Sequence, residues 1–174
     1  SYATIANGGQ YIRPKLYTIV KDHDGNVILD NTSTEGTQVI KPSTAFLLTS
    51  AMQDVVTSGT GTAVNFGGMS IAGKTGTTSD YNDIWFSGST PYYTCTTWTG
   101  YDNNTKLRKG EERSLAKKLW KAVMSQVHEG LENKSFSQPA DIVAQTVCAK
   151  SGKLPTALCG ETLKTEYFAV DTVP

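Results

Sequence analysis

The sequence predicts an α+β domain in which helices flank an antiparallel sheet. Three observations predict it: a hairpin signal near the N-terminus, three closely spaced β-like runs in the middle, and two longer stretches with the apolar periodicity of helices. The connections between the three runs are too short for crossovers between parallel strands, so these runs should form an antiparallel meander. The order hairpin, helix, three strands, helix is typical of the α+β class.

The N-terminal third predicts a short helix followed by a hairpin. Residues 1–6 have the pattern of a helix end, and Asn7-Gly8-Gly9 should terminate it, because glycine readily adopts the left-handed conformation found at such ends. Two β-like runs, 11–21 and 26–29, flank an Asp24-Gly25 pair. Such a pair between β-like runs is a strong signal for a tight hairpin turn.

A helix should follow the polar loop expected at residues 30–38. Ser43 is a candidate N-cap, and apolar residues recur after it at helical spacing. These residues are Phe46, Leu47, Met52, Val55 and Val56. Gly59 should end the helix, and the Gly/Thr-rich stretch 57–62 is expected to be flexible or to lie close to another backbone.

The remaining elements divide the chain into a domain and a tail. The three β-like runs span 69–78, 84–90 and 92–101, and a second helix is predicted from about 112 to 129. The apolar stripe of that helix consists of Leu115, Leu119, Trp120, Val123, Met124 and Val127. We therefore expect one domain portion over residues 1–130 and an irregular C-terminal extension over residues 131–174.

Composition and charge exclude several classes of protein. The 174 residues fit one ordinary domain, and 16 basic residues balance 16 acidic ones, so no basic excess indicates a nucleic-acid partner. No apolar run approaches the length of a membrane-spanning helix, and we expect no membrane contact from this segment. Because the chain starts with Ser1 instead of Met, we expect a piece of a longer protein, with any targeting segment on the missing part.

Three cysteines leave two interpretations open. Cys148 and Cys159 bracket a short Gly/Pro-containing loop, Ser151–Pro155, and a disulfide between them would close a loop of about a dozen residues. Such a crosslink stabilises a fold by about 3 kcal/mol in the chain-entropy model. Two free thiols fit the same sequence. Cys95 lies in a β-like run and should act as a small buried hydrophobe.

No metal or other cofactor is predicted. His23 stands between Asp22 and Asp24, which are potential ligands, but one histidine and two aspartates in a polar stretch are more typical of a turn. The second histidine, His128, is not near a nucleophile motif, so a Ser-His-Asp triad is not expected either.

Lys74-Thr75-Gly76-Thr77 is the segment that most suggests chemistry. On an edge strand, unpaired backbone groups can pair with an extended peptide, and Gly76 would let a substrate backbone come close. Lys74, as the catalytic residue, would place a fixed cation near a developing oxyanion or a substrate carboxylate. The hydroxyls of Thr75 and Thr77 can bind a carboxylate, and the N–H of Thr77 can contribute to an oxyanion hole.

The geometry of a strand restricts this interpretation. Strict alternation places Lys74 on one face and Thr75 and Thr77 on the other, so bringing all three into one site needs strand twist or an edge position. Thr78 and Trp85 would then lie at the rim of the site. Taken alone, Lys-Thr-Gly-Thr also fits an exposed turn with a solvated lysine.

Several segments together resemble class A penicillin-binding proteins. In chain order they are Tyr2-Ala3-Thr4-Ile5-Ala6-Asn7-Gly8-Gly9, Met52-Gln53-Asp54-Val55-Val56-Thr57-Ser58-Gly59-Thr60-Gly61-Thr62, Ala72-Gly73-Lys74-Thr75-Gly76-Thr77-Thr78, Asp83-Ile84-Trp85-Phe86-Ser87-Gly88 and Trp98-Thr99-Gly100-Tyr101-Asp102. The resemblance covers roughly residues 1–130. In that family Lys-Thr-Gly is the third signature of the active site, beside Ser-x-x-Lys and Ser-x-Asn.

The resemblance implies a partial domain of the penicillin-binding and serine β-lactamase-like fold. It implies a D,D-transpeptidase, in which a serine attacks the D-Ala-D-Ala end of a peptidoglycan stem peptide and an amine of a second stem takes over the acyl group. It also implies acylation by β-lactam antibiotics, the N-terminal half of the same domain as partner, and a location at the extracytoplasmic face of the bacterial cell membrane.

The nucleophile that this chemistry requires is missing. No Ser-x-Asn is present, and the one Ser-x-x-Lys, at Ser114-Leu115-Ala116-Lys117, follows Lys-Thr-Gly and should lie on the solvated face of the last helix. The catalytic serine is therefore expected on a part of the protein outside this chain. Two other functions stay open: a serine β-lactamase or D,D-carboxypeptidase, and a non-catalytic domain that binds peptidoglycan.

Overall fold

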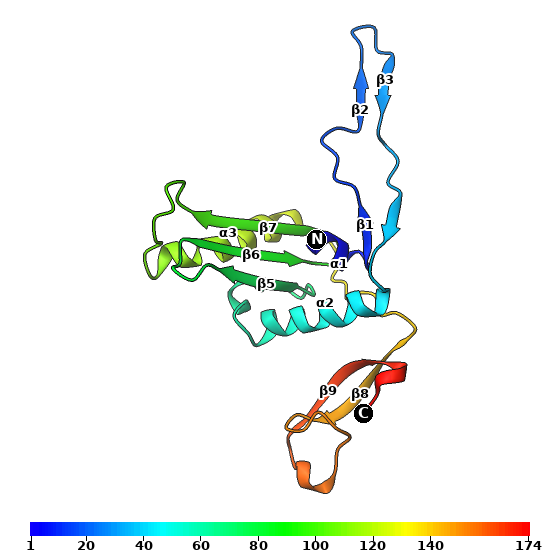
Figure 1. Cartoon of the computed structure of the whole chain (residues 1–174), viewed down its shortest axis with the longest axis vertical. Coiled ribbons are helices and arrows are strands. Elements are labelled where there is room, and N and C mark those ends of the chain that lie inside the picture. The colour runs from blue at the N-terminus through cyan, green and yellow to red at the C-terminus, as the bar shows by residue number, and fades with distance from the viewer.

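A three-stranded antiparallel sheet occupies the centre of the molecule. The computed structural model describes residues 1–174. Strands β5 (Ala72–Thr77), β6 (Asp83–Ser89) and β7 (Thr94–Gly100) follow one another in the sheet in chain order, so the predicted meander is confirmed. Both β5 and β7 are outer strands of this sheet (Figure 1). The predicted α+β class is therefore confirmed as well.

Two aromatic rings join the sheet to the last helix, α3 (Glu111–Val127). Trp120 and Phe86 are fully buried, and their rings meet edge to face with centroids 5.2 Å apart. Glycines make room for them, because a Cβ on Gly73 would lie 2.5 Å from the Phe86 ring and one on Gly88 would lie 2.9 Å from the Trp120 ring. The Trp120 Nε1–H donates to the Cys95 carbonyl oxygen at 2.9 Å, which satisfies the buried indole.

The face of α3 that meets the sheet differs from the predicted stripe. Ala116, Trp120 and Met124 are buried, at the i, i+4, i+8 spacing of one helix face. Trp120 and Met124 belong to the predicted stripe, but its other four residues are 42–51% exposed: Leu115, Leu119, Val123 and Val127. The small Ala116 lets the helix approach the sheet closely enough for the Thr97 hydroxyl to donate to its carbonyl oxygen at 2.7 Å.

Helix α2 (Pro42–Thr57) lies along β5, as Figure 1 shows. The predicted N-cap was wrong: Lys41 is the N-cap and Ser43 lies buried within the helix. Pro42 explains the shift, because proline is favoured in the first helical turn, where no intrahelical N–H bond is lost. The Gly/Thr-rich stretch after α2 is packed closely, as expected, since a Cβ on Gly61 would lie 3.0 Å from the Val55 carbonyl oxygen.

The N-terminal segment forms a helix and a projecting arm (Figure 1). Helix α1 (Tyr2–Ala6) ends before two glycines with positive φ, as predicted. In the arm, β2 (Ile19–Lys21) pairs with β3 (Val27–Asp30). The Asp22 carboxylate accepts hydrogen bonds from two backbone N–H groups of the predicted turn.

The base of this arm was not predicted. Strand β1 (Gln10–Ile12) pairs with β4 (Gly36–Gln38), although residues 30–38 were expected to be a loop. The first predicted run, 11–21, is interrupted after Ile12 by Pro14, which has no N–H to donate to a ladder. The pairing of β1 with β4 joins segments about 26 residues apart, beyond the reach of a local pattern.

The C-terminal extension was expected to be irregular, and this expectation was wrong for two segments. Strands β8 (Ile142–Cys148) and β9 (Leu163–Ala169) pair over their whole length as an antiparallel hairpin. The hairpin is separate from the central sheet in Figure 1 and touches α2. The Phe46 ring meets the Tyr167 ring edge to face at 5.1 Å, and Lys164 forms an ion pair with Asp54.

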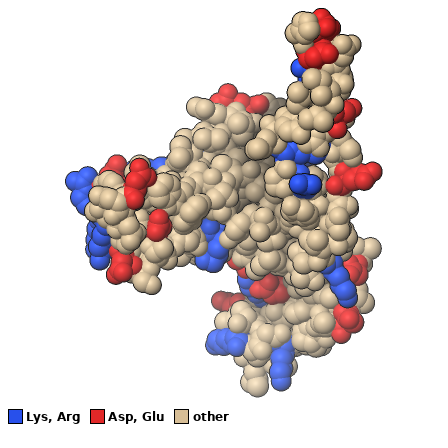
Figure 2. All heavy atoms as spheres, turned by 45° about the horizontal axis from the view of Figure 1, so that its top comes forward, with Lys and Arg blue, Asp and Glu red and all other residues tan.

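The surface carries both charges in mixture. Figure 2 shows lysines and arginines interspersed with aspartates and glutamates, and broad uncharged areas between them. None of the helices is both long enough and apolar enough to span a bilayer.

Candidate active site

Strand β5 carries Lys74, Thr75, Gly76 and Thr77 along the open side of the sheet. Because partners across a ladder share a face, Thr75 lies on the same face as its partner Phe86, whose ring packs against Trp120 of α3. Lys74 and Gly76 lie on the opposite face, with Ser87 and Trp85 as their partners. Lysine and threonine thus point to different sides of one strand, as strict alternation predicts.

The Lys74 side chain is exposed and has a single protein partner. Its Nζ donates to the carbonyl oxygen of the next residue, Thr75, at 3.0 Å. The ammonium group is therefore held close to the strand and is open to solvent on its other sides. A cation in this position can be approached by an anionic group of a ligand.

Gly76 and Trp85 lie so close together that little space remains for a side chain at position 76. A Cβ on Gly76 would lie 3.2 Å from the Trp85 Cβ. Trp85 is 45% exposed, and its ring lies against Trp98 of β7 with centroids 6.2 Å apart. Trp98 is itself fixed, because its Nε1–H donates to the Asp83 carboxylate at 2.9 Å. Trp85 therefore borders the Lys74 face, where a rim residue was predicted.

Thr75 is contacted on the other face by Thr60, for which the sequence predicted no role. Its hydroxyl lies 3.0 Å from the hydroxyl of Thr60, in the Gly/Thr-rich stretch after α2. The Thr60 carbonyl oxygen accepts a hydrogen bond from Lys117 Nζ of α3, also at 3.0 Å. Thr75 is thus linked through Thr60 to the last helix.

Thr78, predicted at the rim of the site, belongs to the turn after β5 and forms hydrogen bonds within that turn. Its hydroxyl accepts hydrogen bonds from the backbone N–H groups of Asn82 and Asp83, at 3.1 and 2.9 Å. Its own N–H donates to the Asp83 carbonyl oxygen at 3.1 Å. The threonine fixes the shape of the β5–β6 turn, next to the positions that were predicted to bind substrate.

A loop between β7 and α3 covers this turn. The Leu107 N–H donates to the Tyr81 carbonyl oxygen at 3.0 Å, and the Leu107 side chain is buried. The Arg113 guanidinium lies 3.8 Å above the Tyr81 ring and donates through Nε to the Leu107 carbonyl oxygen. The turn is thereby packed against the start of α3.

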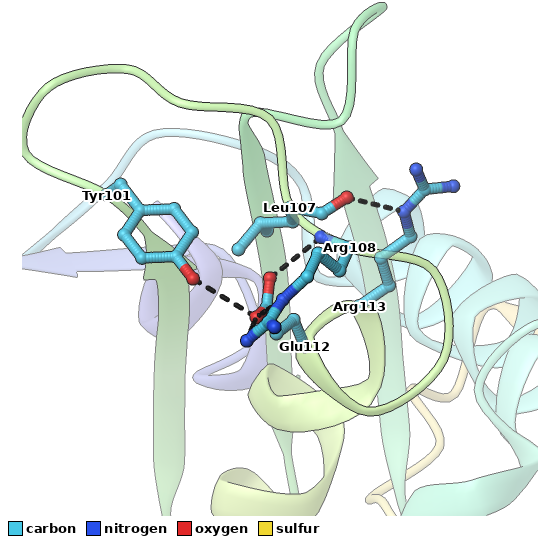
Figure 3. Close-up of polar contacts among 5 residues, drawn as sticks. All are labelled: Tyr101, Leu107, Arg108, Glu112 and Arg113. Carbon is cyan, nitrogen blue, oxygen red and sulfur yellow. Dashed lines mark hydrogen bonds and ion pairs between the residues drawn. The ribbon is translucent and has the colours of Figure 1, made fainter.

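Glu112 connects the two ends of the loop between β7 and α3 through hydrogen bonds (Figure 3). Its carboxylate accepts hydrogen bonds from the Arg108 backbone N–H at 2.7 Å, from the Arg108 guanidinium, and from the Tyr101 hydroxyl at 3.1 Å. These donors, the Arg108 backbone N–H first, lower the pKa of Glu112 below its ordinary value. The side chain is only 13% exposed.

The Ser-x-x-Lys sequence on α3 does not have the geometry of a nucleophile and its base. The Ser114 hydroxyl donates to the Glu111 carbonyl oxygen of its own helix at 2.8 Å. Lys117, expected on a solvated face, instead reaches Thr60. The two side chains have separate partners, which agrees with the rejection of Ser114 as the nucleophile.

The other candidate groups lie far from β5 or in ordinary surroundings. His23 contacts Asp24 at 3.0 Å on the exposed tip of the arm, and no group of three potential metal ligands occurs in the chain. Cys95 is half-buried against the core, and burial raises the pKa of its thiol. Cys148 and Cys159 are free thiols in the C-terminal hairpin.

Comparison with protein families assigns both parts of the chain. Residues 1–125 match the penicillin binding protein transpeptidase domain, and residues 138–174 match the C-terminal domain of penicillin-binding protein 1A. The chain therefore belongs to the penicillin-binding protein transpeptidase family. The resemblance to class A penicillin-binding proteins seen in the sequence is confirmed.

Individual relatives agree with this assignment. Penicillin-binding protein 1A of Clostridium botulinum is 40% identical over the whole chain, which spans 22% of that relative. A crystal structure of penicillin-binding protein 1A from Haemophilus influenzae superposes on 99% of this chain and 31% of its own, with a TM-score of 0.84 at 23% identity, and supports the fold. Penicillin-binding protein A from M. tuberculosis, solved as an imipenem acyl-enzyme complex, has a TM-score of 0.56 at 25% identity over 71% of this chain and 29% of its own.

The Glu112 contacts predict a pH-dependent contribution to stability in the complete transpeptidase domain. Since the folded state lowers the carboxyl pKa, the contribution is present above the ordinary pKa and is lost as the pH falls through the lowered one. Thermal unfolding should therefore show Glu112→Gln melting below the wild type at about pH 6, with the difference becoming smaller as the pH falls below the ordinary glutamate pKa of about 4.3. Glu129→Gln, which removes an exposed carboxylate without a partner, is the control. A difference that stays constant across this range would contradict the assignment.

Proposed function

We propose that this chain forms one wall of the active site of a serine D-Ala-D-Ala transpeptidase. The observation that carries the proposal is the Lys74–Thr77 segment on an outer strand with an open edge, in a chain of the penicillin-binding protein transpeptidase family. The reaction would cross-link peptidoglycan stem peptides through a serine acyl-enzyme. The chain spans about a fifth of its curated relatives, so the nucleophile would come from another part of the protein.

Each residue of the segment has a role that fits its position. An extended stem peptide would pair with the outer edge of β5, and Gly76 would let its backbone approach without hindrance. Lys74, exposed on one face, would stabilise charge that develops at the reacting carbonyl or hold a substrate carboxylate. Thr75 and Thr77 would bind that carboxylate through their hydroxyls, and Trp85 would border the site. β-Lactams would acylate the same serine.

The rest of the domain would cover two open surfaces of this chain. The exposed apolar residues of α3, from Leu115 to Val127, lie in line along the helix at a spacing of four residues. Such a stripe costs free energy in water, and contact with an apolar surface removes that cost. The outer edge of β7 also has no strand beside it. We infer that the N-terminal half of the transpeptidase domain packs on both, on the extracytoplasmic side of the membrane.

The alternative functions are less well supported. A serine β-lactamase or D,D-carboxypeptidase would use the same strand, but both family matches are to penicillin-binding proteins, including a C-terminal domain of penicillin-binding protein 1A. A non-catalytic peptidoglycan-binding domain would not need a cation and hydroxyls on an open strand edge.

The role of Lys74 predicts a kinetic defect in the complete protein. Lys74→Ala should lower the rate of acylation by a fluorescent penicillin by more than about tenfold, because it removes a cation from the developing charge. Stopped-flow or gel-based labelling measures this rate. The matched control is Lys109→Ala, which removes an exposed lysine from the loop before α3. An unchanged rate in Lys74→Ala would exclude the proposed role.

The contact between Thr60 and Thr75 predicts a smaller defect of the same kind. Thr60→Val keeps the shape of the side chain but leaves the Thr75 hydroxyl without its partner. Loss of one hydrogen bond of about 1 kcal/mol should reduce the acylation rate about fivefold. Thr60→Ser, which retains the hydroxyl, should stay close to wild type. Equal rates for the two variants would show that the hydroxyl does not orient Thr75.

A further inference from the structure

Two buried thiols lie together where the β8–β9 hairpin closes. Cys148 is the last residue of β8, and Cys159 ends a short 3-10 turn, η2 (Ala157–Cys159), just before β9. They are 4% and 9% exposed. The Ala149 N–H, next to Cys148, donates to the carbonyl oxygen of Thr162, three residues after Cys159, at 2.8 Å. The third cysteine, Cys95, lies in β7 of the central sheet.

The backbone around both residues is fixed by hydrogen bonds. The N–H groups of Ser151 and Gly152 donate to the Cys148 carbonyl oxygen at 3.2 and 2.8 Å, and the Cys148 N–H donates to the Lys153 carbonyl oxygen at 2.9 Å. On the other side, the Thr162 N–H donates to the Cys159 carbonyl oxygen at 3.1 Å. The backbone of the loop itself thus places Cys148 and Cys159 at the same end of the hairpin.

The hairpin has little else to stabilise it. Within residues 138–174, which form the second family match, only four residues are buried: Ile142, Val147, Cys148 and Cys159. None of them belongs to the main hydrophobic cluster around Trp120. Units of fewer than about 40 residues usually need a crosslink, a metal or a partner, because they bury too little apolar surface.

We propose that Cys148 and Cys159 form an intramolecular disulfide that closes the tip of the β8–β9 hairpin. The proposal does not depend on the transpeptidase reaction. A structural zinc site would need four ligands, whereas no third cysteine, histidine, aspartate or glutamate joins this pair. A disulfide needs only the two sulfurs present, and it would restrict the loop of residues 149–158 in the unfolded and the locally opened state.

The oxidation requires a disulfide-bearing oxidant, either a small-molecule disulfide or a thiol–disulfide oxidoreductase. The Cys148 thiolate attacks one sulfur of that disulfide, and the other sulfur leaves as a thiolate. Cys159 then loses its proton and attacks the Cys148 sulfur, releasing the second thiolate. Overall, two protein thiols lose two electrons and two protons, and the oxidant is reduced to two thiols. Hydrogen bonds from Cys159 and then Ser151 lower the pKa of Cys148, which favours it as the attacking group.

Lysines inside the loop make the crosslink directly detectable. The complete protein is treated with oxidised glutathione, its free thiols are blocked with iodoacetamide in denaturant, and it is digested with trypsin without reductant. Cleavage after Lys150 and Lys153 separates the peptide 135–150, with Cys148, from the peptide 154–164, with Cys159. We expect both peptides in one species whose mass is their sum less two hydrogens, and its loss on reduction.

Two results of this mapping would overturn the proposal. One is alkylation of Cys148 and Cys159 by iodoacetamide after the treatment with oxidised glutathione. The other is a crosslink that joins either of them to Cys95. Cys95→Ser is the matched control and should leave the crosslinked species unchanged, because Cys95 lies in the central sheet. If Cys148 and Cys159 react with iodoacetamide only after a chelator is added, they bind a metal, and the proposed disulfide is wrong.

Limited proteolysis of the native protein tests whether the disulfide keeps the loop of residues 149–158 from opening. Cleavage after Lys150 and Lys153 requires local opening of the loop, which a crosslink suppresses. We expect reduction to raise the cleavage rate at these two lysines by about tenfold or more in the wild type. The double variant Cys148→Ala, Cys159→Ala should be cleaved at one rate with or without reductant. Equal rates for the oxidised and the reduced wild type would contradict the proposed role, whether or not the variant folds.

Discussion

The packing of Phe86 and Trp120 between the sheet and α3 is the contact on which the rest of the structure depends. Gly73 on β5 and Gly88 on β6 leave space for the two rings. With Gly73 directed toward the core, the next residue, Lys74, is directed to the opposite face by the alternation of the strand. The direction of the Lys74 side chain therefore follows from the packing of Phe86, on the neighbouring strand, against Trp120 of α3.

The open edge of β5 is supported from three sides. The Thr78 hydroxyl fixes the turn at its end, Glu112 holds the loop that covers this turn, and Thr60 contacts Thr75 from the far face. All of these contacts lead back to the neighbourhood of α3, through Glu112 at its start and Lys117 in its middle. These contacts fix the strand before any ligand arrives, and a binding surface that does not have to reorganise lowers the free-energy cost of binding.

Local patterns in the sequence predicted the elements whose contacts are local. The meander, helix α2, helix α3 and the turn at Asp24-Gly25 agree with the structure because short connections and periodicity determine them. The β1–β4 and β8–β9 pairings were missed because each joins segments separated by a long loop, and no pattern within either segment identifies its partner. The orientation of α3 was misread because the small Ala116, and not the larger Leu115, faces the sheet.

The candidate site also divides into residues that local sequence predicts and residues that only long-range contacts bring together. Lys74, Thr75, Gly76 and Thr77 could be found because their sequence is a family signature on a strand, and Trp85 because it is close in the chain. Thr60 and Lys117 could not be found in this way, since their contacts with the site cross 15 and 57 residues of sequence. The Gly/Thr-rich stretch 57–62 did indicate that this segment could lie close to another backbone. It did not identify Thr75 as the residue that Thr60 contacts.

Hydrogen exchange of the complete transpeptidase domain tests most directly whether the outer edge of β5 binds substrate. Backbone amides of residues 74–78 would be compared before and after acylation by benzylpenicillin, by mass spectrometry of short peptides. If a bound acyl group pairs with this edge, exchange in this segment should slow by about tenfold or more, while the arm formed by β2 and β3 should not change. Unchanged exchange at residues 74–78 in a fully acylated protein would contradict the account.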